Sequence, residues 1–439
     1  MNTSLRTQDL LAIGLMTFAL FLGAGNLIFP PSMGLEAGTN LLPAMMGFLV
    51  TAVGLPAFTL IVLGRITTTN NLTKALPSWL GKVFWVLLFT SIGPAFGMPR
   101  AVTVAYEMGI KPFVEGDHLL LFTIIFCGVT LLLAFTPGKL VDYIGKVMTP
   151  ALILMLVALS VAAIMSPLGV PQLPSADYQN SAVTHGLIQG YMTMDGIAAV
   201  GFGWVIIQAI NAKGVTEPKE VARVSIYVAA IYAVLMGACY LAMGYVGATS
   251  STVAASAANG GEILTLYVHG IFGEYGQLLL AAIIIMACLT TTVGLTNASA
   301  EYYRASFKAP FALTSVVVVS LTCVIANFGL AQIIKVSLPA ILLLCPVAIA
   351  LVMASFVGTL NKRFKPSHVS VLVVTLAFGS LDALAILDMM PGNFNTQLQE
   401  SLPLYSAHAS WLVPCLLVLT FNSLRSVISQ RKNCEPVEA

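Results

Sequence analysis

Residues 21–31 of the chain, FLGAGNLIFPP, decide its fold. They place glycines, an asparagine and two prolines in the middle of an apolar run that is long enough to cross a membrane. Unpaired backbone groups are costly in hydrocarbon, so a non-helical segment at that depth persists only inside protein or beside a water-filled cavity. The stretch therefore predicts a membrane helix that is broken next to a binding site.

A break of this kind leaves the ends of two half-helices inside the bilayer. The free N–H groups of one end suit an anion, and the free carbonyl groups of the other end suit a cation. An amino acid carries both charges, so the predicted site fits an amino acid together with a sodium ion.

The composition is that of a membrane protein. Of the 439 residues, 58% are hydrophobic and 9% are charged, and the mean hydropathy is +0.92. No polar segment is long enough for a separate soluble domain, so residues 1–439 are predicted to form one all-α polytopic membrane domain, whose first span stays uncleaved. A spanning helix needs roughly 20 mostly apolar residues, and about twelve such spans are predicted, at residues 9–30, 41–64, 83–107, 118–136, 147–166, 186–212, 222–247, 275–300, 310–328, 333–357, 367–389 and 404–426.

The basic residues predict the orientation, because cytoplasmic loops of membrane proteins carry an excess of lysine and arginine. One side of the predicted bundle carries 17 of the 20 basic residues, Lys111 alone lies on the other side, and Arg100 and Lys335 fall within or at the edge of spans. Both termini are therefore predicted to be cytoplasmic. The 17 residues are Arg6, Arg65, Lys74, Lys82, Lys139, Lys146, Lys213, Lys219, Arg223, Arg304, Lys308, Lys362, Arg363, Lys365, Arg425, Arg431 and Lys432.

A second interrupted span is predicted at residues 191–203, YMTMDGIAAVGFG. It contains Asp195, followed by Gly196, and then a cluster at residues 201–203 before helix is expected to resume at Trp204. A pair of interrupted spans at corresponding places in two halves is typical of transporters built from an inverted repeat. The chain is therefore predicted to contain two five-helix repeats, 9–166 and 186–357, with broken helices 1 and 6, and two additional helices at 367–426.

These residues resemble a known family. Gly25-Asn26 followed by Phe29-Pro30 resembles the first-helix break of sodium-coupled transporters with the bacterial leucine transporter fold, and residues 201–203 resemble their sixth helix. More specifically, the segments at 18–31, 137–140 (PGKL), 190–195 (GYMTMD), 214–217 (GVTE) and 287–296 (ACLTTTVGLT) resemble the bacterial branched-chain amino acid system II carriers over nearly the full length. The resemblance implies cation-coupled uptake of L-leucine, L-isoleucine and L-valine through the bacterial cytoplasmic membrane by alternating access.

The resemblance also implies a substrate site. The substrate carboxylate is expected at Ala24, Gly25 and Asn26, where glycine permits close approach of the backbone. The ammonium group is expected at the carbonyls of Gly196, Ile197 and Ala199, with Asp195 adjacent and Phe202 beside the aliphatic tail. An acid within a membrane helix is a functional candidate by default. The competing interpretations are a helix-capping role for Asp195 and ordinary core packing for Phe202.

The sodium ion is expected where hard oxygen ligands gather. The eighth span carries Thr290, Thr291 and Thr292 in apolar surroundings, and the resemblance places Gly23 and Asn26 opposite Thr291 and Thr292. The competing interpretation is that these hydroxyls only bond to carbonyls one turn earlier. In the sodium-coupled transporters that the chain resembles, a hydroxyl on the sixth helix helps to form a second sodium site. Here Ile197 or Ala199 stands in its place, so the sequence does not favour coupling to two sodium ions.

Two alternatives remain open from the sequence: proton coupling through Asp195, and transport of another small neutral amino acid or a nucleobase. Arg100 and Glu107 are seven residues apart. They are predicted to form an ion-paired gate near the outer mouth, to pair structurally, or to extend toward the membrane interface. Asp382 is predicted to serve packing or oligomer contact. Gly93, Pro94, Gly97 and Pro99 are predicted flexing points.

Other function classes are disfavoured. The five histidines and seven cysteines show no metal-ligand spacing, and no nucleotide-binding or hydrolytic motif is present. A net charge of +2 provides no basic patch for nucleic acid. The chain is therefore predicted to be a transporter in the lipid bilayer, not an enzyme, with no cofactor other than the coupling ion and no obligatory protein partner.

Overall fold

The computed structural model describes residues 5–66, 69–135, 149–257, 259–360, 367–387 and 389–432. The segment at 137–140 and five of the basic residues lie outside these ranges, namely Lys139, Lys146, Lys362, Arg363 and Lys365.

The described residues form helices and connecting turns, with no β-strand among them. The principal α-helices are α1 (Thr7–Phe21), α2 (Ala24–Ala37), α3 (Leu41–Leu49), α4 (Leu55–Ile66), α5 (Ser78–Thr90), α6 (Gly97–Gly109), α7 (Leu119–Ala134), α9 (Thr149–Met165), α10 (Ala176–Met192), α11 (Asp195–Ala212), α12 (Pro218–Ala248), α14 (Gly260–Phe307), α15 (Phe311–Ala326), α16 (Leu330–Leu360), α17 (His368–Ile386) and α19 (Leu412–Lys432). The shorter helices are α13 (Ser251–Ala254), α18 (Gly392–Ser401), η1 (Gly38–Asn40), η3 (Thr69–Leu72), η5 (Lys111–Phe113) and η8 (Tyr405–Ala407), and the π-helical segments are η2 (Val50–Gly54) and η4 (Ser91–Ala95).

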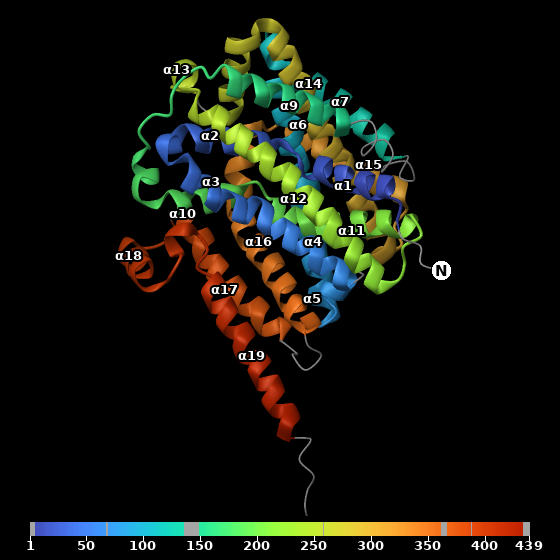
Figure 1. The fold of residues 1–439 in the computed structure, drawn as a ribbon. Helices are drawn as coiled ribbons and strands as arrows, with labels where there is room; N and C mark the ends of the chain where they lie inside the picture. The colour runs from blue at the N-terminus through green and yellow to red at the C-terminus, as the bar shows by residue number, and fades with distance from the viewer. Residues whose placement is uncertain are drawn as a thin grey trace, which may run out of the picture.

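Each of the twelve predicted spans coincides with a helix or with consecutive helices of the bundle (Figure 1). Seven helices of the described chain are long and apolar enough to cross a membrane, and five shorter apolar helices accompany them. Some predicted boundaries were wrong: α10 and α14 begin well before the expected positions 186 and 275, and α18 was not predicted.

The outer surface of the bundle is apolar. On α7, for example, Leu120, Leu121 and Leu132 are 61%, 60% and 71% exposed. Large apolar side chains facing outward along whole helices are what a lipid environment requires. The all-helical membrane fold predicted from the sequence is confirmed.

The first span is broken as predicted, between α1 and α2. Leu22 has a ψ of 84° and Gly23 adopts an extended conformation, with φ −112° and ψ −168°. The break is shorter than the sequence indicated, because helix resumes at Ala24 and continues through Pro30 and Pro31.

The second break lies between α10 and α11, at Thr193 and Met194, where Met194 takes a left-handed conformation with φ 69°. The expectation that helix resumes only at Trp204 was wrong, since residues 201–203 lie within α11. Backbone in the membrane stays helical unless other groups satisfy it. The glycines of α11 serve packing instead: a Cβ at Gly201 would lie 2.5 Å from Ile92 Cδ1.

The third span is kinked. Between α5 and α6 the π-helical segment η4 contains Pro94, and Gly93 has non-helical angles of φ −87° and ψ −118°. Two of the four predicted flexing points therefore lie at an interruption of the helix.

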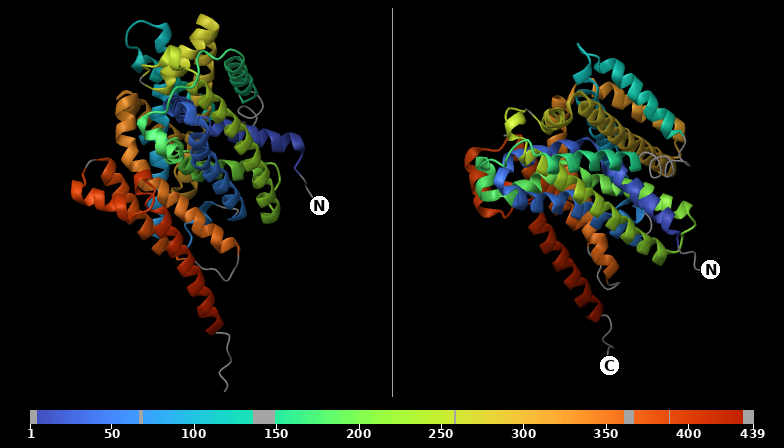
Figure 2. Two further views of the ribbon diagram at one scale, coloured as in Figure 1. Left: turned by 60° about the vertical axis from the view of Figure 1, so that its left-hand side comes forward. Right: turned by 45° about the horizontal axis from the view of Figure 1, so that its top comes forward.

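Helices α17 and α19 leave the bundle. Helix α17 packs on α16 and on α19, and the pair extends away from the other helices in all three views (Figures 1 and 2). Around the first break, by contrast, α2 and α1 both pack on α12 and α14.

The division into repeats at 9–166 and 186–357 stays a prediction.

Candidate functional site

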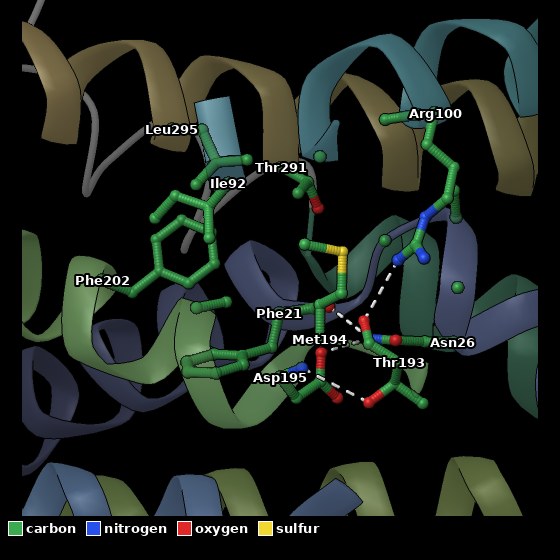
Figure 3. Close-up of a pocket in the computed structure, with 16 residues that line it drawn as sticks. Phe21, Asn26, Ile92, Arg100, Thr193, Met194, Asp195, Phe202, Thr291 and Leu295 are labelled. Carbon is green, nitrogen blue, oxygen red and sulfur yellow. Dashed lines mark hydrogen bonds between the residues drawn. The ribbon is translucent and has the colours of Figure 1, made fainter. Parts of the chain in front are cut away.

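Residues of both helix breaks line the same pocket (Figure 3). The Nδ2 atom of Asn26, in the first turn of α2, lies 3.3 Å from Oδ1 of Asp195 and also donates to the carbonyl of Phe21. Asn26 is 1% and Asp195 is 3% exposed. A buried polar pair therefore joins the two broken spans.

Asp195 is the first residue of α11, where the partial positive charge of the helix end favours a carboxylate. Its second carboxylate oxygen accepts a hydrogen bond of 2.5 Å from the hydroxyl of Tyr240 on α12. Tyr240 was missed by sequence reasoning, because one tyrosine in an apolar span carries no pattern that points to a partner.

Arg100 also belongs to this site. Its guanidinium donates to the carbonyls of Met192 and Thr193, at 3.3 Å and 3.1 Å, across the end of α10. The side chain is therefore directed to the second break, and the predicted gate with Glu107 was wrong, since the ion pairs in the described part of the chain do not include Arg100. The cost of a charge in a membrane helix was the signal that could have placed Arg100 at the site.

A cavity of about 40 Å³ lies between these groups. This volume has room for water but not for an aliphatic amino acid. Polar side chains line one part of it, namely Asn26, Arg100, Thr193, Asp195 and Thr291, and apolar side chains line the rest, including Phe21, Ile92, Phe202 and Leu295.

A second cavity, of about 280 Å³, lies between α4, α10, α16 and the segment that leads into α19. It is larger, but apolar side chains such as Val50, Leu187 and Met353 form most of its wall, and no acid, lysine or arginine lines it. Binding sites combine an apolar wall with a few convergent polar groups. The smaller cavity meets this condition and is therefore the candidate site.

The residues expected at the carboxylate end lie together at this cavity. Ala24, Gly25 and Asn26 form the first turn of α2 and line it, and Phe202 faces it with its ring centroid 5.1 Å from that of Phe21. The expected ammonium acceptors differ.

Gly196, Ile197 and Ala199 lie inside α11, where each carbonyl accepts from the N–H four residues on. The carbonyls at the second break are instead those of Met192 and Thr193. The expected acceptors lie inside the helix because the break is shorter than predicted and ends at Asp195, and the assignment of the ammonium group to them stays a prediction.

The threonines of α14 face two directions. The hydroxyl of Thr291 lies 3.0 Å from the carbonyl of Leu20 and 3.3 Å from that of Leu22, at the first break. A Cβ at Gly23 would lie 3.2 Å from this hydroxyl oxygen. Gly23 and Thr291 are therefore adjacent, and purely local bonding is excluded for Thr291.

Thr292 does not face the first break. Its hydroxyl donates to the carbonyl of Leu289 and lies 3.3 Å from the hydroxyl of Thr130 on α7. The second threonine directed at α1 is Thr290, which donates to the carbonyl of Ala19 at 2.9 Å. The expected pair was thus shifted by one residue along the helix.

The sequence profile of the family described as branched-chain amino acid transport protein matches residues 6–429. The chain belongs to this family. Members of the branched-chain amino acid transport family are transporters and not enzymes. The chain is 39% identical over 440 residues to the branched-chain amino acid transport system 2 carrier protein of Pseudomonas aeruginosa, covering 100% of this chain and 99% of the relative. It is 38% identical over 418 residues to the branched-chain amino acid permease BrnQ of Haemophilus influenzae, covering 94% and 96%.

Solved structures share the fold of this family member. A transporter of the nucleobase-cation-symport-1 family, with bromovinylhydantoin bound, aligns with a TM-score of 0.63 at 12% identity, covering 96% of this chain and 93% of that one. MhsT in complex with L-phenylalanine aligns with a TM-score of 0.53 at 15% identity, covering 94% and 98%. At these identities the likeness establishes the fold alone.

Proposed function

We propose that this protein carries leucine, isoleucine and valine into the cytoplasm together with a sodium ion, by alternating access. The observation that carries the proposal is the contact of Thr291 with the carbonyls of the first break, beside a cavity that is polar at one end and apolar at the other.

The substrate class is supported by the wall of the cavity. Asn26, Arg100 and Asp195 supply both signs of charge and a neutral amide, as a zwitterion requires, whereas Phe21, Ile92 and Phe202 offer an apolar surface to a branched aliphatic chain. The names of the relatives in Pseudomonas and Haemophilus favour branched-chain amino acids over other neutral amino acids and over nucleobases.

The sodium ion is supported by oxygen chemistry. The carbonyls of Leu20 and Leu22 and the hydroxyl of Thr291 are uncharged oxygens, and each carbonyl lies within hydrogen-bond distance of the hydroxyl. Hard cations favour such ligands, and the carbonyls at an unwound break are the groups that coordinate sodium in broken-helix transporters. We propose Thr291, Gly23 and the adjoining backbone as the ion site, with Asn26 nearby.

The membrane location is proposed as the bacterial cytoplasmic membrane with both termini inside. In support, the Nζ atom of Lys213, at the end of α11, lies 2.9 Å from the carboxylate of Asp9. This contact brings the N-terminal segment and the loop after α11 to the same end of the bundle, as the distribution of basic residues predicts.

The test is uptake of labelled leucine into proteoliposomes that contain the purified protein. An inward sodium gradient is compared with an equal potassium gradient and, separately, with an inward proton gradient. Accumulation with sodium alone, weakened at the same sodium concentration in Thr291→Val and retained in Thr291→Ser, supports the proposal. Thr123→Val is the matched control, because its buried hydroxyl bonds only to the carbonyl of Leu119 on its own helix. No leucine uptake under any gradient would refute it.

Proton coupling is the second candidate, and the buried carboxylate of Asp195 with its partners Tyr240 and Asn26 favours it. The proton arm of the same experiment separates the two. Leucine accumulation driven by protons and abolished in Asp195→Asn, with no effect of sodium, would move the coupling from Thr291 to Asp195.

A further inference from the structure

The carbonyls at the end of α10 need hydrogen-bond donors, and here the donor is a charged side chain, that of Arg100. Its side chain is 7% exposed, two of its nitrogens donate to the carbonyls of Met192 and Thr193, and its Nε has no hydrogen-bond partner. A buried cation is strongly stabilised by an anion. The carboxylate of Asp195 lines the same cavity, but its oxygens accept hydrogen bonds from Asn26 and Tyr240, so the direct partners of the guanidinium are carbonyl groups.

The space around Gly25 is fitted to this guanidinium. A Cβ at Gly25 would lie 2.7 Å from Nη2 of Arg100 and 3.2 Å from the carbonyl oxygen of Thr193. The ring of Phe29 lies on another side, with its centroid 5.8 Å from the central guanidinium carbon. Arg100 therefore fills the gap between the first turn of α2 and the second break, which is the region of the candidate cavity.

The break carbonyls are also where a substrate ammonium group would be held. Two cations cannot share them, because like charges a few ångströms apart repel strongly at low dielectric constant. The cavity of about 40 Å³ is too small for an aliphatic amino acid unless a side chain in its wall moves. A bound amino acid must therefore displace the guanidinium from Met192 and Thr193.

We propose that Arg100 is a specificity-determining residue that exchanges partners: it occupies the break carbonyls as an internal cation, yields them to the substrate ammonium group, and then pairs with the substrate carboxylate. The planar guanidinium matches a carboxylate with two parallel hydrogen bonds. The exchange leaves the substrate carboxylate paired with the guanidinium, and the ammonium group bonded to the break carbonyls in the cavity that Asp195 lines. The proposal rests on the proposed function, since it takes an aliphatic amino acid as the substrate.

The exchange predicts how wild-type protein distinguishes fragments of leucine. Isopentylamine, which is leucine without its carboxylate, must displace Arg100 without offering it a new partner, so it binds weakly. Isocaproate, which is leucine without its amino group, pairs with Arg100 but leaves the break carbonyls without a cation, so it also binds weakly.

The test measures binding of leucine, isopentylamine and isocaproate to purified wild-type and Arg100→Gln proteins in sodium, by competition with labelled leucine for the wild type and by ligand-induced thermal shift for both. In Arg100→Gln we expect leucine affinity to fall about thirtyfold or more, as when one partner of a buried charge pair is removed. Isopentylamine affinity should stay equal or increase, because the break carbonyls are released. Isocaproate binding should disappear.

Thr103→Val is the matched control. Thr103 lies one turn further along α6, is 1% exposed, and its hydroxyl bonds only to carbonyls of its own helix. The ratio of leucine affinity to isopentylamine affinity in Thr103→Val should therefore equal that of the wild type. If Arg100→Gln does not fold, Arg100→Lys makes the same comparison: it keeps the charge, loses the two-point contact, and should lower the ratio at least about fivefold.

A purely structural role of Arg100 would weaken leucine and isopentylamine equally. That result in a folded variant, or an unchanged ratio in both variants, would overturn the proposal while leaving sodium-driven leucine uptake by the wild type intact. Failure of the wild type to bind or accumulate leucine would instead remove the proposed function, and the exchange with it.

Discussion

The side-chain amide of Asn26 donates to the carboxylate of Asp195 across 169 positions of sequence. Asn26 lies in the first turn of α2, the second half of the first broken span. Asp195 is the first residue of α11, the second half of the second broken span. The two interruptions therefore form a single polar centre, and a change on either side is transmitted to the other through buried hydrogen bonds.

Removing the hydroxyl that supports Asp195 should weaken transport. In Tyr240→Phe the carboxylate loses its 2.5 Å hydrogen bond in a buried setting, at a cost of about 1–3 kcal/mol. We expect leucine affinity to fall about tenfold, measured by concentration-dependent uptake. Tyr267→Phe is the comparison, because that buried tyrosine bonds to Thr249 away from the cavity. Equal effects of the two substitutions would mean that Tyr240 serves only the stability of the fold.

The two neighbouring threonines should differ in their effect on sodium dependence. Thr291→Val removes a hydroxyl that faces the first break, whereas Thr292→Val removes one that faces Thr130 on α7. The sodium concentration for half-maximal uptake should rise about tenfold or more in the first variant and remain near the wild-type value in the second. A sodium shift in Thr292→Val alone would restore the arrangement expected from the sequence.

Alanine should be rejected at Gly25 and accepted at Gly196. A Cβ at Gly25 meets Arg100 at 2.7 Å, whereas a Cβ at Gly196 meets only Cys345 Sγ at 3.5 Å and Ile349 Cδ1 at 3.6 Å, which are ordinary contacts. Gly25→Ala should therefore lower leucine uptake at least about tenfold with the protein still folded, and Gly196→Ala should keep most of it. The measurement is initial uptake rate normalised to the amount of protein in the vesicles.

The contact between α2 and α12 should be sensitive to added volume. A Cβ at Gly34 would lie 2.1 Å from the carbonyl oxygen of Gly244, so Gly34→Ala must push two helix backbones apart. We expect a clear fall in melting temperature in detergent. Gly237→Ala, also on α12 but with no atom within 4 Å of the added carbon, should melt at the same temperature or higher, because alanine is the better helix former by up to about 1 kcal/mol.

The sequence predicted the spans and the positions of both breaks, because hydropathy and clusters of glycine and proline act locally and the bilayer penalises exposed backbone strongly. It overestimated the length of the second break. The glycines at 201 and 203 admit neighbouring side chains and do not interrupt α11, and composition alone does not separate these two uses of glycine.

Side-chain direction was the harder part. Consecutive residues on an α-helix point about 100° apart, so a shift of one position replaced Thr292 by Thr290 as the second hydroxyl directed at α1. Arg100 and Tyr240 lie far in sequence from Asp195, and only the three-dimensional packing of α6, α11 and α12 brings them to it.

The kink at Gly93 has a mechanical consequence for Arg100, which lies on the helix that begins just beyond it. Because the regular helix is interrupted at η4, the direction of α6 is set by its packing on α14 and not by continuity with α5. When Arg100 releases the carbonyls of Met192 and Thr193, as proposed, the hydrogen bonds between α6 and the second broken span are lost. In the proposed exchange, substrate binding would therefore remove hydrogen bonds that hold the helix beyond the kink to the second broken span.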